Sequence, residues 1–264
     1  MIFLKLKTPI QKALLCFALL HLAHFSFSQK TDSTKVISTF SGAVSATNNG
    51  ISIVPSFSLD KPAAIFNLSL GRNRWSFEPD LRFSLQGKPW SFLFWGRYKL
   101  VNTDKFRMTA GTHLGLNFKT SVLPINGDTS ETTVTRRYLA GELFPRYLLT
   151  KNISIGIYYL YSHGLDAGTI NNTNFITLYT NFSNIKLAKQ LFIKVTPQFY
   201  YLKLDKQDGL YFTATATLAR QNFPLSISST INKIVRTNIS GSKNFVWNVS
   251  LVYSFNKKYI DSVR

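Results

Sequence analysis

The chain has 264 residues, of which 45% are hydrophobic and 14% aromatic, while only 16% are charged. So small a charged share does not cover an ordinary water-facing surface, and so many aromatic residues exclude a disordered chain. Lys and Arg outnumber Asp and Glu by 31 to 12, and a single Cys excludes both a disulfide framework and a cysteine zinc site.

Residues 1–28 have the features of a secretory signal peptide. Three Lys residues (Lys5, Lys7 and Lys12) precede or open the apolar run at 13–20, and small residues occupy the two positions that a signal peptidase reads before Gln29. Cleavage there removes the only Cys and two of the four His residues. We therefore expect neither a cysteine nucleophile nor a metal site nor any other cofactor in the mature chain.

From about residue 50 onward, apolar and polar residues alternate. Trp75, Phe77 and Leu81 share one parity, while Ser76 and Glu78 share the other. Successive side chains of a strand point to opposite faces, so this period of two predicts strands with one apolar and one polar face. The polar parity carries mostly Ser, Thr, Asn, Gly and Tyr, unlike a water-facing sheet. We therefore expect an all-β fold, a transmembrane antiparallel up-and-down β-barrel, rather than a soluble sandwich.

The alternation and the turn residues between the segments predict about twelve strands, with fourteen as the alternative. The predicted strands are 50–59, 63–71, 74–85, 89–101, 105–119, 133–149, 152–163, 172–185, 190–203, 209–219, 222–234 and 244–256. Long connections at 120–132, 164–171 and 235–243 alternate with short ones, as the two sides of such barrels do. The barrel then spans 50–256, and a periplasmic tail spans 257–264.

Two features of this division need a structural explanation. Residues 29–49 precede the predicted barrel and form a plug, an extension or an extra strand. Four Pro residues fall inside predicted strands, where each removes a ladder donor, so we expect bulges or kinks there. These residues are Pro55, Pro79, Pro145 and Pro197.

The last predicted strand carries the most specific motif. Its run at 249–255 places Val249, Leu251, Tyr253 and Phe255 on one face. This run is similar to the C-terminal assembly signal of the outer-membrane β-barrel proteins of Gram-negative bacteria, and the whole alternating pattern resembles these porin-like barrels. It departs from the signal because 256–264 follow the aromatic end. The resemblance implies a location in the cell outer membrane, contact with the lipid bilayer and insertion by the outer-membrane assembly machinery.

Charged residues of the polar parity gather on the early strands and predict a charge cluster in the lumen. The cluster consists of Glu78, Asp80, Arg82, Arg97, Lys99, Arg107, His113, Glu142 and Arg146, with Arg136 beside it. A simple hairpin at 86–89 places Glu78 opposite Arg97 and Asp80 opposite Trp95, so Glu78 and Arg97 should pair. The cluster either braces one wall through salt bridges or forms a basic constriction that selects anions.

These features lead to one main functional hypothesis and two alternatives. The main hypothesis is a narrow pore or transport-related barrel for small, anionic solutes. The first alternative is a non-conducting structural or assembly barrel with a filled lumen. The second is a lipid or peptide hydrolase that uses His163, near Asp166, or His113, near Glu142; the absence of a known hydrolase signature favours a non-enzyme.

The strongly basic charge raises the question of acidic partners, either nucleic acid or the phosphate groups of lipids. No nucleic-acid-binding motif is present, so we expect no nucleic-acid partner. Basic residues near the strand ends could contact phosphate groups of lipopolysaccharide. These residues are Lys119, Arg136, Arg137, Lys233, Arg236 and Lys243.

Overall fold

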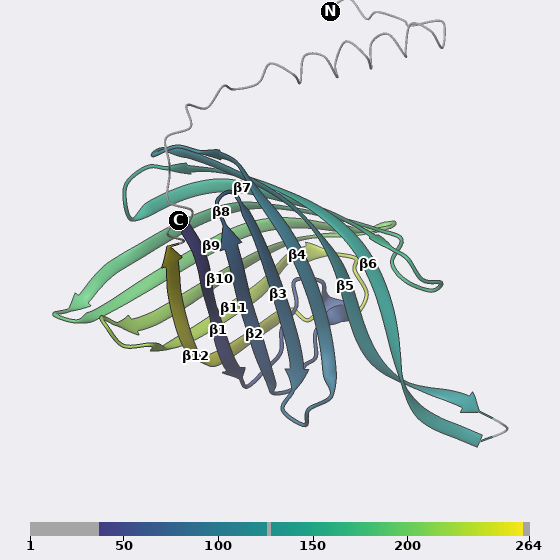
Figure 1. Cartoon of the computed structure of the whole chain (residues 1–264). Coiled ribbons are helices and arrows are strands. Elements are labelled where there is room, and N and C mark those ends of the chain that lie inside the picture. Colours follow the sequence, from purple (N-terminus) through teal and green to yellow (C-terminus); the bar gives the residue numbers. More distant parts are fainter. Residues whose placement is uncertain (1–36, 126–127, 261–264) are drawn as a thin grey trace, which may run out of the picture. The chain divides into compact units, whose positions relative to one another are not determined.

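The computed structural model describes residues 37–125 and 128–260, and these residues form a closed antiparallel barrel of twelve strands (Figure 1). Each strand pairs with its neighbours in the chain, and β1 pairs with β12 to close the barrel. The fold class and the strand number expected from the alternation are therefore confirmed. The predicted signal peptide lies outside the described residues.

The strand bounds follow the predicted segments closely from the second strand onward. The strands are β1 (Ile37–Thr47), β2 (Ala63–Arg72), β3 (Trp75–Ser84), β4 (Pro89–Asn102), β5 (Phe106–Ile125), β6 (Asp128–Leu148), β7 (Ile153–Gly164), β8 (Asn172–Ala188), β9 (Leu191–Leu204), β10 (Gln207–Arg220), β11 (Leu225–Thr237) and β12 (Phe245–Ile260). Among the described residues, no helix is long and apolar enough to cross a membrane.

The first strand was assigned to the wrong segment. Residues 50–59 form a loop with a short 3-10 helix, η1 (Pro55–Phe57), whereas β1 lies in the segment whose structure the sequence left open. Pro55 stands at the start of η1, where its missing N–H costs nothing, while a central strand would lose a ladder bond there. The barrel therefore starts at Ile37, not at residue 50, and the strand count is unchanged.

Two further bounds differ from the expectation. The predicted loop at 120–132 is mostly strand, because β5 and β6 continue as a hairpin that extends well past the barrel (Figure 1). Strand β12 continues to Ile260, four residues past the predicted end, and its last residues pair with the start of β1, as in Ile37 with Ile260. The whole described part of the expected tail, residues 257–260, is therefore barrel wall.

The other three prolines that were expected inside strands lie where a ladder is interrupted. Beside Pro79, pairing of β2 with β3 stops at Asn67–Asp80 and resumes at Leu70–Phe77. The β6–β7 ladder lapses in the same way at Pro145, and the β8–β9 ladder at Pro197. A missing N–H on one side of each strand explains these local gaps, while the opposite ladder continues past each proline.

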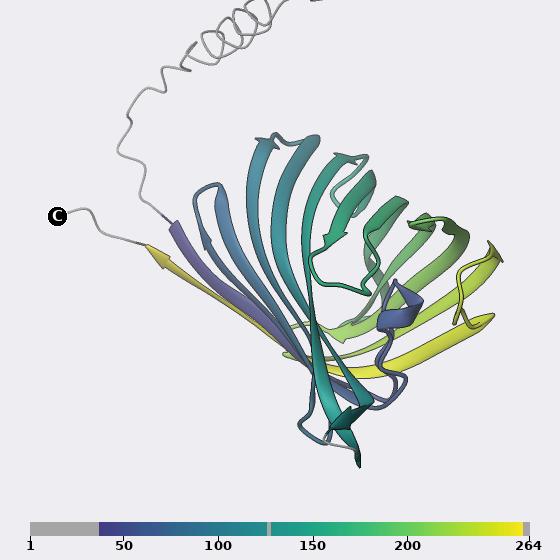
Figure 2. The same cartoon turned by 90° about the vertical axis from the view of Figure 1, so that its right-hand side faces the viewer.

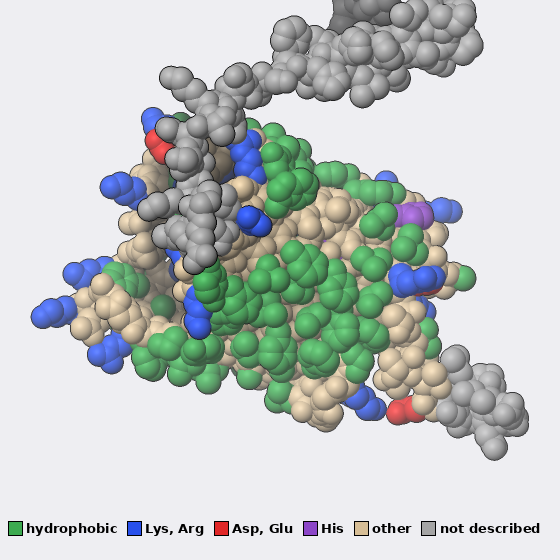
Figure 3. All heavy atoms as spheres, viewed as in Figure 1, with side chains coloured by type: hydrophobic (Ala, Val, Ile, Leu, Met, Phe, Trp, Pro, Cys, Tyr) green, Lys and Arg blue, Asp and Glu red, His purple; other side chains and the backbone are tan. Residues whose placement is uncertain are grey.

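Large apolar side chains cover the outside of the barrel. Outward residues such as Phe77, Leu178 and Trp247 are about half exposed, although they are fully apolar. Figure 3 shows a continuous apolar area over the front strands, with Lys and Arg gathered towards the two ends. An apolar belt flanked by polar ends fits a hydrocarbon layer, and closure leaves no strand edge unpaired in it.

The two ends of the barrel differ in their connections. The end where β1 starts and β12 finishes, called the inner end below, has only short turns at 73–74, 103–105, 149–152, 189–190 and 221–224. The opposite, outer end carries the longer loops 48–62, 165–171 and 238–244, although its connection at 205–206 is short. The alternation of loop lengths is thus present but incomplete.

Candidate functional site

The loop of residues 48–62, called the lumen loop below, folds into the barrel, and η1 lies inside the strands (Figure 2). The indole N–H of Trp90 on β4 donates to the carbonyl of Phe57 at 2.7 Å. The Phe57 ring also contacts Tyr138 on β6, with 5.1 Å between ring centroids. The lumen loop, which joins β1 to β2, therefore contacts β4 and β6 from inside the barrel.

Aromatic side chains fill the lumen beside this loop. Phe175, Tyr200 and Tyr211 form a buried cluster with leucines of β9, and Ile239 from the outer loop 238–244 joins it. Tyr200 and Tyr211 stack with ring centroids 4.8 Å apart, and Val54 of the lumen loop packs against the cluster. The side of the lumen formed by β8 to β10 is thus apolar and filled near the outer end.

Arg97 joins two carboxylates in the middle of the lumen. Its Nε donates to Glu142 Oε1 at 2.5 Å, and its Nη1 is ion-paired with Glu78. The Tyr158 hydroxyl donates to the second Glu142 oxygen at 2.7 Å. Gly111 permits this packing, because a Cβ there would lie 2.8 Å from Glu142 Oε1.

The expected ion pair of Glu78 with Arg97 is present, but the expected register is wrong. Glu78 lies opposite Trp95, and Asp80 lies opposite Leu93. The turn pairs Phe83 with Pro89, and a one-residue shift lies between Arg82 and Phe83, so the partners of Glu78 and Asp80 lie two residues away from those of a simple hairpin. The long Arg97 side chain spans the diagonal, which keeps the ion pair on the same face.

A second ion pair lies within β3, two residues apart on the lumen face. Arg82 donates to both carboxylate oxygens of Asp80, at 2.9 and 2.5 Å, and its guanidinium lies over the Trp90 ring. Three described acidic residues point into the lumen from the barrel strands, and each is paired with an arginine. These residues are Glu78, Asp80 and Glu142.

Four basic residues of the inner face, called the inner-mouth ring below, lie on β4, β5, β6 and β9 and have no carboxylate partner among the described residues. Lys99, Arg107 and Arg146 belong to the predicted cluster, and the register places Arg107 directly opposite Arg146. Sequence reasoning missed the fourth, Lys194 on β9, although its alternation with Thr196 and Gln198 marks the same face. None of the four forms a salt bridge among the described residues, and all lie within a few positions of the inner-end turns.

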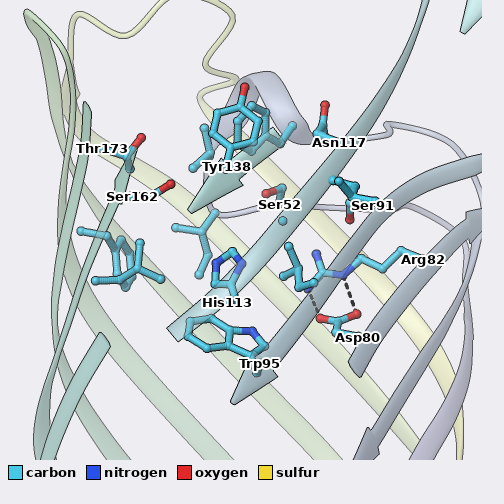
Figure 4. Close-up of a pocket in the computed structure, with 18 of the residues that line it drawn as sticks. Ser52, Asp80, Arg82, Ser91, Trp95, His113, Asn117, Tyr138, Ser162 and Thr173 are labelled. Atoms are coloured by element: carbon cyan, nitrogen blue, oxygen red, sulfur yellow. Dashed lines mark hydrogen bonds and ion pairs between the residues drawn. The ribbon is translucent and has the colours of Figure 1, made fainter. Parts of the chain in front are cut away.

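Three spaces follow one another along the lumen. A cavity of about 400 Å³ lies between the lumen loop and strands β3 to β8 (Figure 4). A wider space of about 780 Å³ at the outer end is lined in part by Lys119, Arg136 and Lys206. A smaller one of about 170 Å³ at the inner end is lined by Arg107 and Arg146. Lys119 and Arg136, expected near the strand ends, therefore line the lumen side, as the place of Arg136 beside the charge cluster also predicted.

The two histidines of the described residues lie on opposite faces of the barrel wall. His113 is buried against Trp95, with ring centroids 4.1 Å apart, and lies opposite Ala140 rather than Glu142. His163 shares the outward parity of Tyr161, and the carboxylate of nearby Asp166 binds Arg137 instead. Within the described residues, neither imidazole forms a hydrogen bond or ion pair with a carboxylate.

The motif residues of β12 lie on its outer face. Val249, Leu251 and Tyr253 are exposed there, and Phe255 packs against Phe40 of β1 with 5.1 Å between ring centroids. Their face and spacing agree with the sequence motif, and their role in assembly stays a prediction.

Comparison with known proteins finds likeness in fold. No protein-family model and no curated protein sequence matches the chain. A KdgM porin in complex with disordered oligogalacturonate superposes with a TM-score of 0.51 and 10% identity, over 82% of this chain and 99% of the porin. A second KdgM porin structure has a TM-score of 0.51 and 11% sequence identity, over 81% of this chain and 99% of the porin. LpxR from Salmonella typhimurium has a TM-score of 0.49 and 12% sequence identity, over 81% of this chain and 100% of LpxR. The chain therefore has the fold of the porin-like β-barrels of the outer membrane.

Proposed function

We propose that the protein is an outer-membrane barrel that conducts small anionic solutes. The observation that carries this proposal is the charge balance of the lumen. Its inward carboxylates are neutralised by arginines, whereas the inner-mouth ring of Lys99, Arg107, Arg146 and Lys194 has no carboxylate partners among the described residues. Rings of Arg and Lys attract anions and repel cations in a narrow aqueous path.

The fold comparison supports the same class of solute. The KdgM porin of similar fold was solved with oligogalacturonate, a chain of sugar carboxylates. A solute of this kind, an acidic sugar or another small carboxylate, suits a wall that offers unpaired cations beside uncharged hydroxyl groups. Such hydroxyl pairs line the later strands, for example Thr215 with Thr230 at 2.9 Å.

Ion selectivity in planar bilayers tests this proposal. With a KCl gradient across the membrane, the reversal potential should have the sign of a chloride-selective pore. Replacing Lys99, Arg107, Arg146 and Lys194 together with Gln should move it towards zero, because the fixed positive charge is removed. The matched control is Lys203→Gln, since Lys203 lies on the outward parity of β9 beside Tyr201. A cation-selective wild-type pore, or an equal effect of the control, would contradict the proposal.

The second candidate, a non-conducting barrel, is favoured by one observation: the lumen loop and the Phe175 cluster occupy the outer part of the lumen. Replacing residues 51–59 with a short Gly-Ser link should then raise the conductance several-fold. A wild-type barrel that stays silent while the shortened barrel conducts would favour the filled-lumen function. Equal conductance of both proteins would show that the lumen loop does not restrict the path.

We infer that the barrel is not a hydrolase. The positions of His113 and His163, each without a carboxylate partner in the described chain, support this inference. Replacement of either histidine with Ala should leave any lipid or peptide turnover of the purified barrel unchanged. A loss of turnover in one variant would restore the hydrolase hypothesis.

We also propose that lipid, lipopolysaccharide and the assembly machinery are the partners of the barrel. Of the basic residues expected to contact lipopolysaccharide, Lys243 is held by Asp60 at 3.0 Å and Lys233 by Asn244 at 2.7 Å. Because these contacts occupy Lys243 and Lys233, we propose Arg236 as the outer-end residue that binds lipopolysaccharide phosphate groups. Arg236→Gln should weaken lipopolysaccharide binding to the purified barrel, and Arg220→Gln at the inner end should not.

A further inference from the structure

The cavity of about 400 Å³ beneath the lumen loop has the make-up of a ligand site. The lumen loop covers one side of it with mostly apolar side chains, those of Ile51, Ile53, Val54 and Phe57. Its walls include the rings of Trp95, Tyr158 and Phe175 together with several Ser, Thr and Asn side chains. Pockets of this size, largely apolar with a few polar groups, are typical of small-molecule sites.

Charge chemistry narrows the class of ligand. Three ionised side chains line the cavity, and each is neutralised within the protein. Asp80 and Arg82 bind each other, and Arg97 is bound by Glu78 and Glu142 from outside the cavity. An ionic ligand would therefore lose its hydration without gaining an unpaired counter-charge, which disfavours it strongly. The cavity instead suits an uncharged molecule.

Two polar side chains of the cavity have hydrogen-bonding capacity that the protein does not use. His113 is 8% exposed and Tyr138 is 5% exposed, and both line the cavity (Figure 4). His113 Nδ1 and the Tyr138 hydroxyl are fully buried and have no hydrogen-bond partner among the described residues. Burial of such groups without a partner is costly and rare in native proteins, and it points to a bound molecule.

We propose that this cavity binds an uncharged, largely apolar ring compound with a polar substituent that hydrogen-bonds to His113 or Tyr138. The Trp95 ring and the imidazole of His113, in contact at 4.1 Å between centroids, provide one aromatic wall, and Phe57 with Tyr138 provides another. This site lies in the outer part of the lumen and shares no residue with the inner-mouth ring. It therefore does not depend on anion conduction.

Binding of 1-naphthol, an uncharged bicyclic phenol, tests the site. The full barrel is reconstituted in lipid nanodiscs and titrated by equilibrium dialysis, with empty nanodiscs to measure partition into lipid. We expect one saturable site per barrel. The anion 1-naphthoate, which has similar rings, should bind at least tenfold more weakly.

Conservative variants show whether the two polar groups contact the probe. Tyr138→Phe removes only an oxygen without a partner, and His113→Phe keeps a ring of similar width. Each should weaken 1-naphthol binding about threefold to tenfold, the usual effect of losing one hydrogen bond. Each should leave the melting temperature of the barrel unchanged or raised, because no internal hydrogen bond is lost. Tyr147→Phe on the outer face is the matched control and should change neither quantity.

Several results would overturn the inference. Uptake that does not saturate above empty nanodiscs would show that the cavity holds water only. Equal affinity for 1-naphthoate would show that the ligand class is wrong. A lower melting temperature with unchanged probe affinity would assign His113 and Tyr138 a structural role. If one variant does not fold, the other still decides between these outcomes.

Discussion

Arg97 holds the two sides of the charged wall together, and Glu142 is its more buried partner. The Glu142 side chain is 2% exposed and receives hydrogen bonds from both Arg97 and Tyr158. Glu142→Gln removes one of the two carboxylates that neutralise Arg97. We expect a loss of about 2 kcal/mol in the free energy of unfolding, as for other hydrogen bonds to a charged group. Urea unfolding in lipid vesicles measures it.

The control for this variant is Glu131→Gln. Glu131 lies on the exposed hairpin, 4.0 Å from Lys88, and both side chains are about two-thirds exposed. An ion pair of this kind contributes little, so the control should unfold at the wild-type urea concentration. Equal losses in both variants would contradict the role assigned to Glu142.

The outer loop 165–171 is fixed to β6 by the Asp166 carboxylate and by a hydrogen bond from the Leu165 N–H to the Arg137 carbonyl. Asp166 accepts hydrogen bonds from the backbone N–H and the guanidinium of Arg137, and these bonds hold the pKa of Asp166 below its usual range. Because the folded-state pKa is lowered, the contact stabilises the loop fully above the ordinary carboxyl pKa. The stabilisation is lost as the pH falls through the lowered pKa.

Hydrogen exchange of the Arg137 amide measures this contact directly. After correction for the intrinsic pH dependence of exchange, its protection should be constant from pH 7 to about 5 and decrease below about 4. In Asp166→Ala the protection should be low and independent of pH. Constant protection of the wild-type amide down to pH 2 would show that another group fixes the loop.

Most strands could be predicted from alternation alone, because inward and outward side chains meet different surroundings on every strand. The first strand could not, since residues 37–47 and 50–59 both alternate and only Pro55 distinguishes them. The lengths of β5 and β6 were also underestimated. Their hairpin continues past the last pairs with flanking strands, where burial no longer imposes a pattern.

For the candidate site, the sequence predicted which side chains face the lumen, but not most of the contacts among them. Parity placed Glu78, Arg97 and Glu142 in the lumen and predicted the ion pair of Glu78 with Arg97, but not that of Arg97 with Glu142, which spans β5. The register shift at Arg82 was not visible, because a bulge depends on how two strands meet. The lumen loop and the cavity against Tyr138 depend on contacts between distant segments, which no local pattern encodes.

At the scale of the whole molecule, the barrel reverses the distribution of apolar and polar side chains found in a soluble β protein. Its outward residues are large and apolar, and its inward residues carry the charges and hydroxyl groups. This arrangement is stable only if hydrocarbon surrounds the belt, since the same surface in water would expose a large apolar area. The lumen assignments, the inner-mouth ring and the cavity all rest on it.

Fluorescence quenching by brominated lipids tests this arrangement most directly. The chain has four Trp residues, of which Trp247 is 51% exposed on the outer face and Trp95 is buried in the lumen. Two variants, each keeping one of these Trp residues and carrying Phe at the other three positions, are reconstituted in bilayers with brominated acyl chains. Trp247 should be strongly quenched, and Trp95 should keep most of its emission. Strong quenching of Trp95 with Trp247 unaffected would contradict the account.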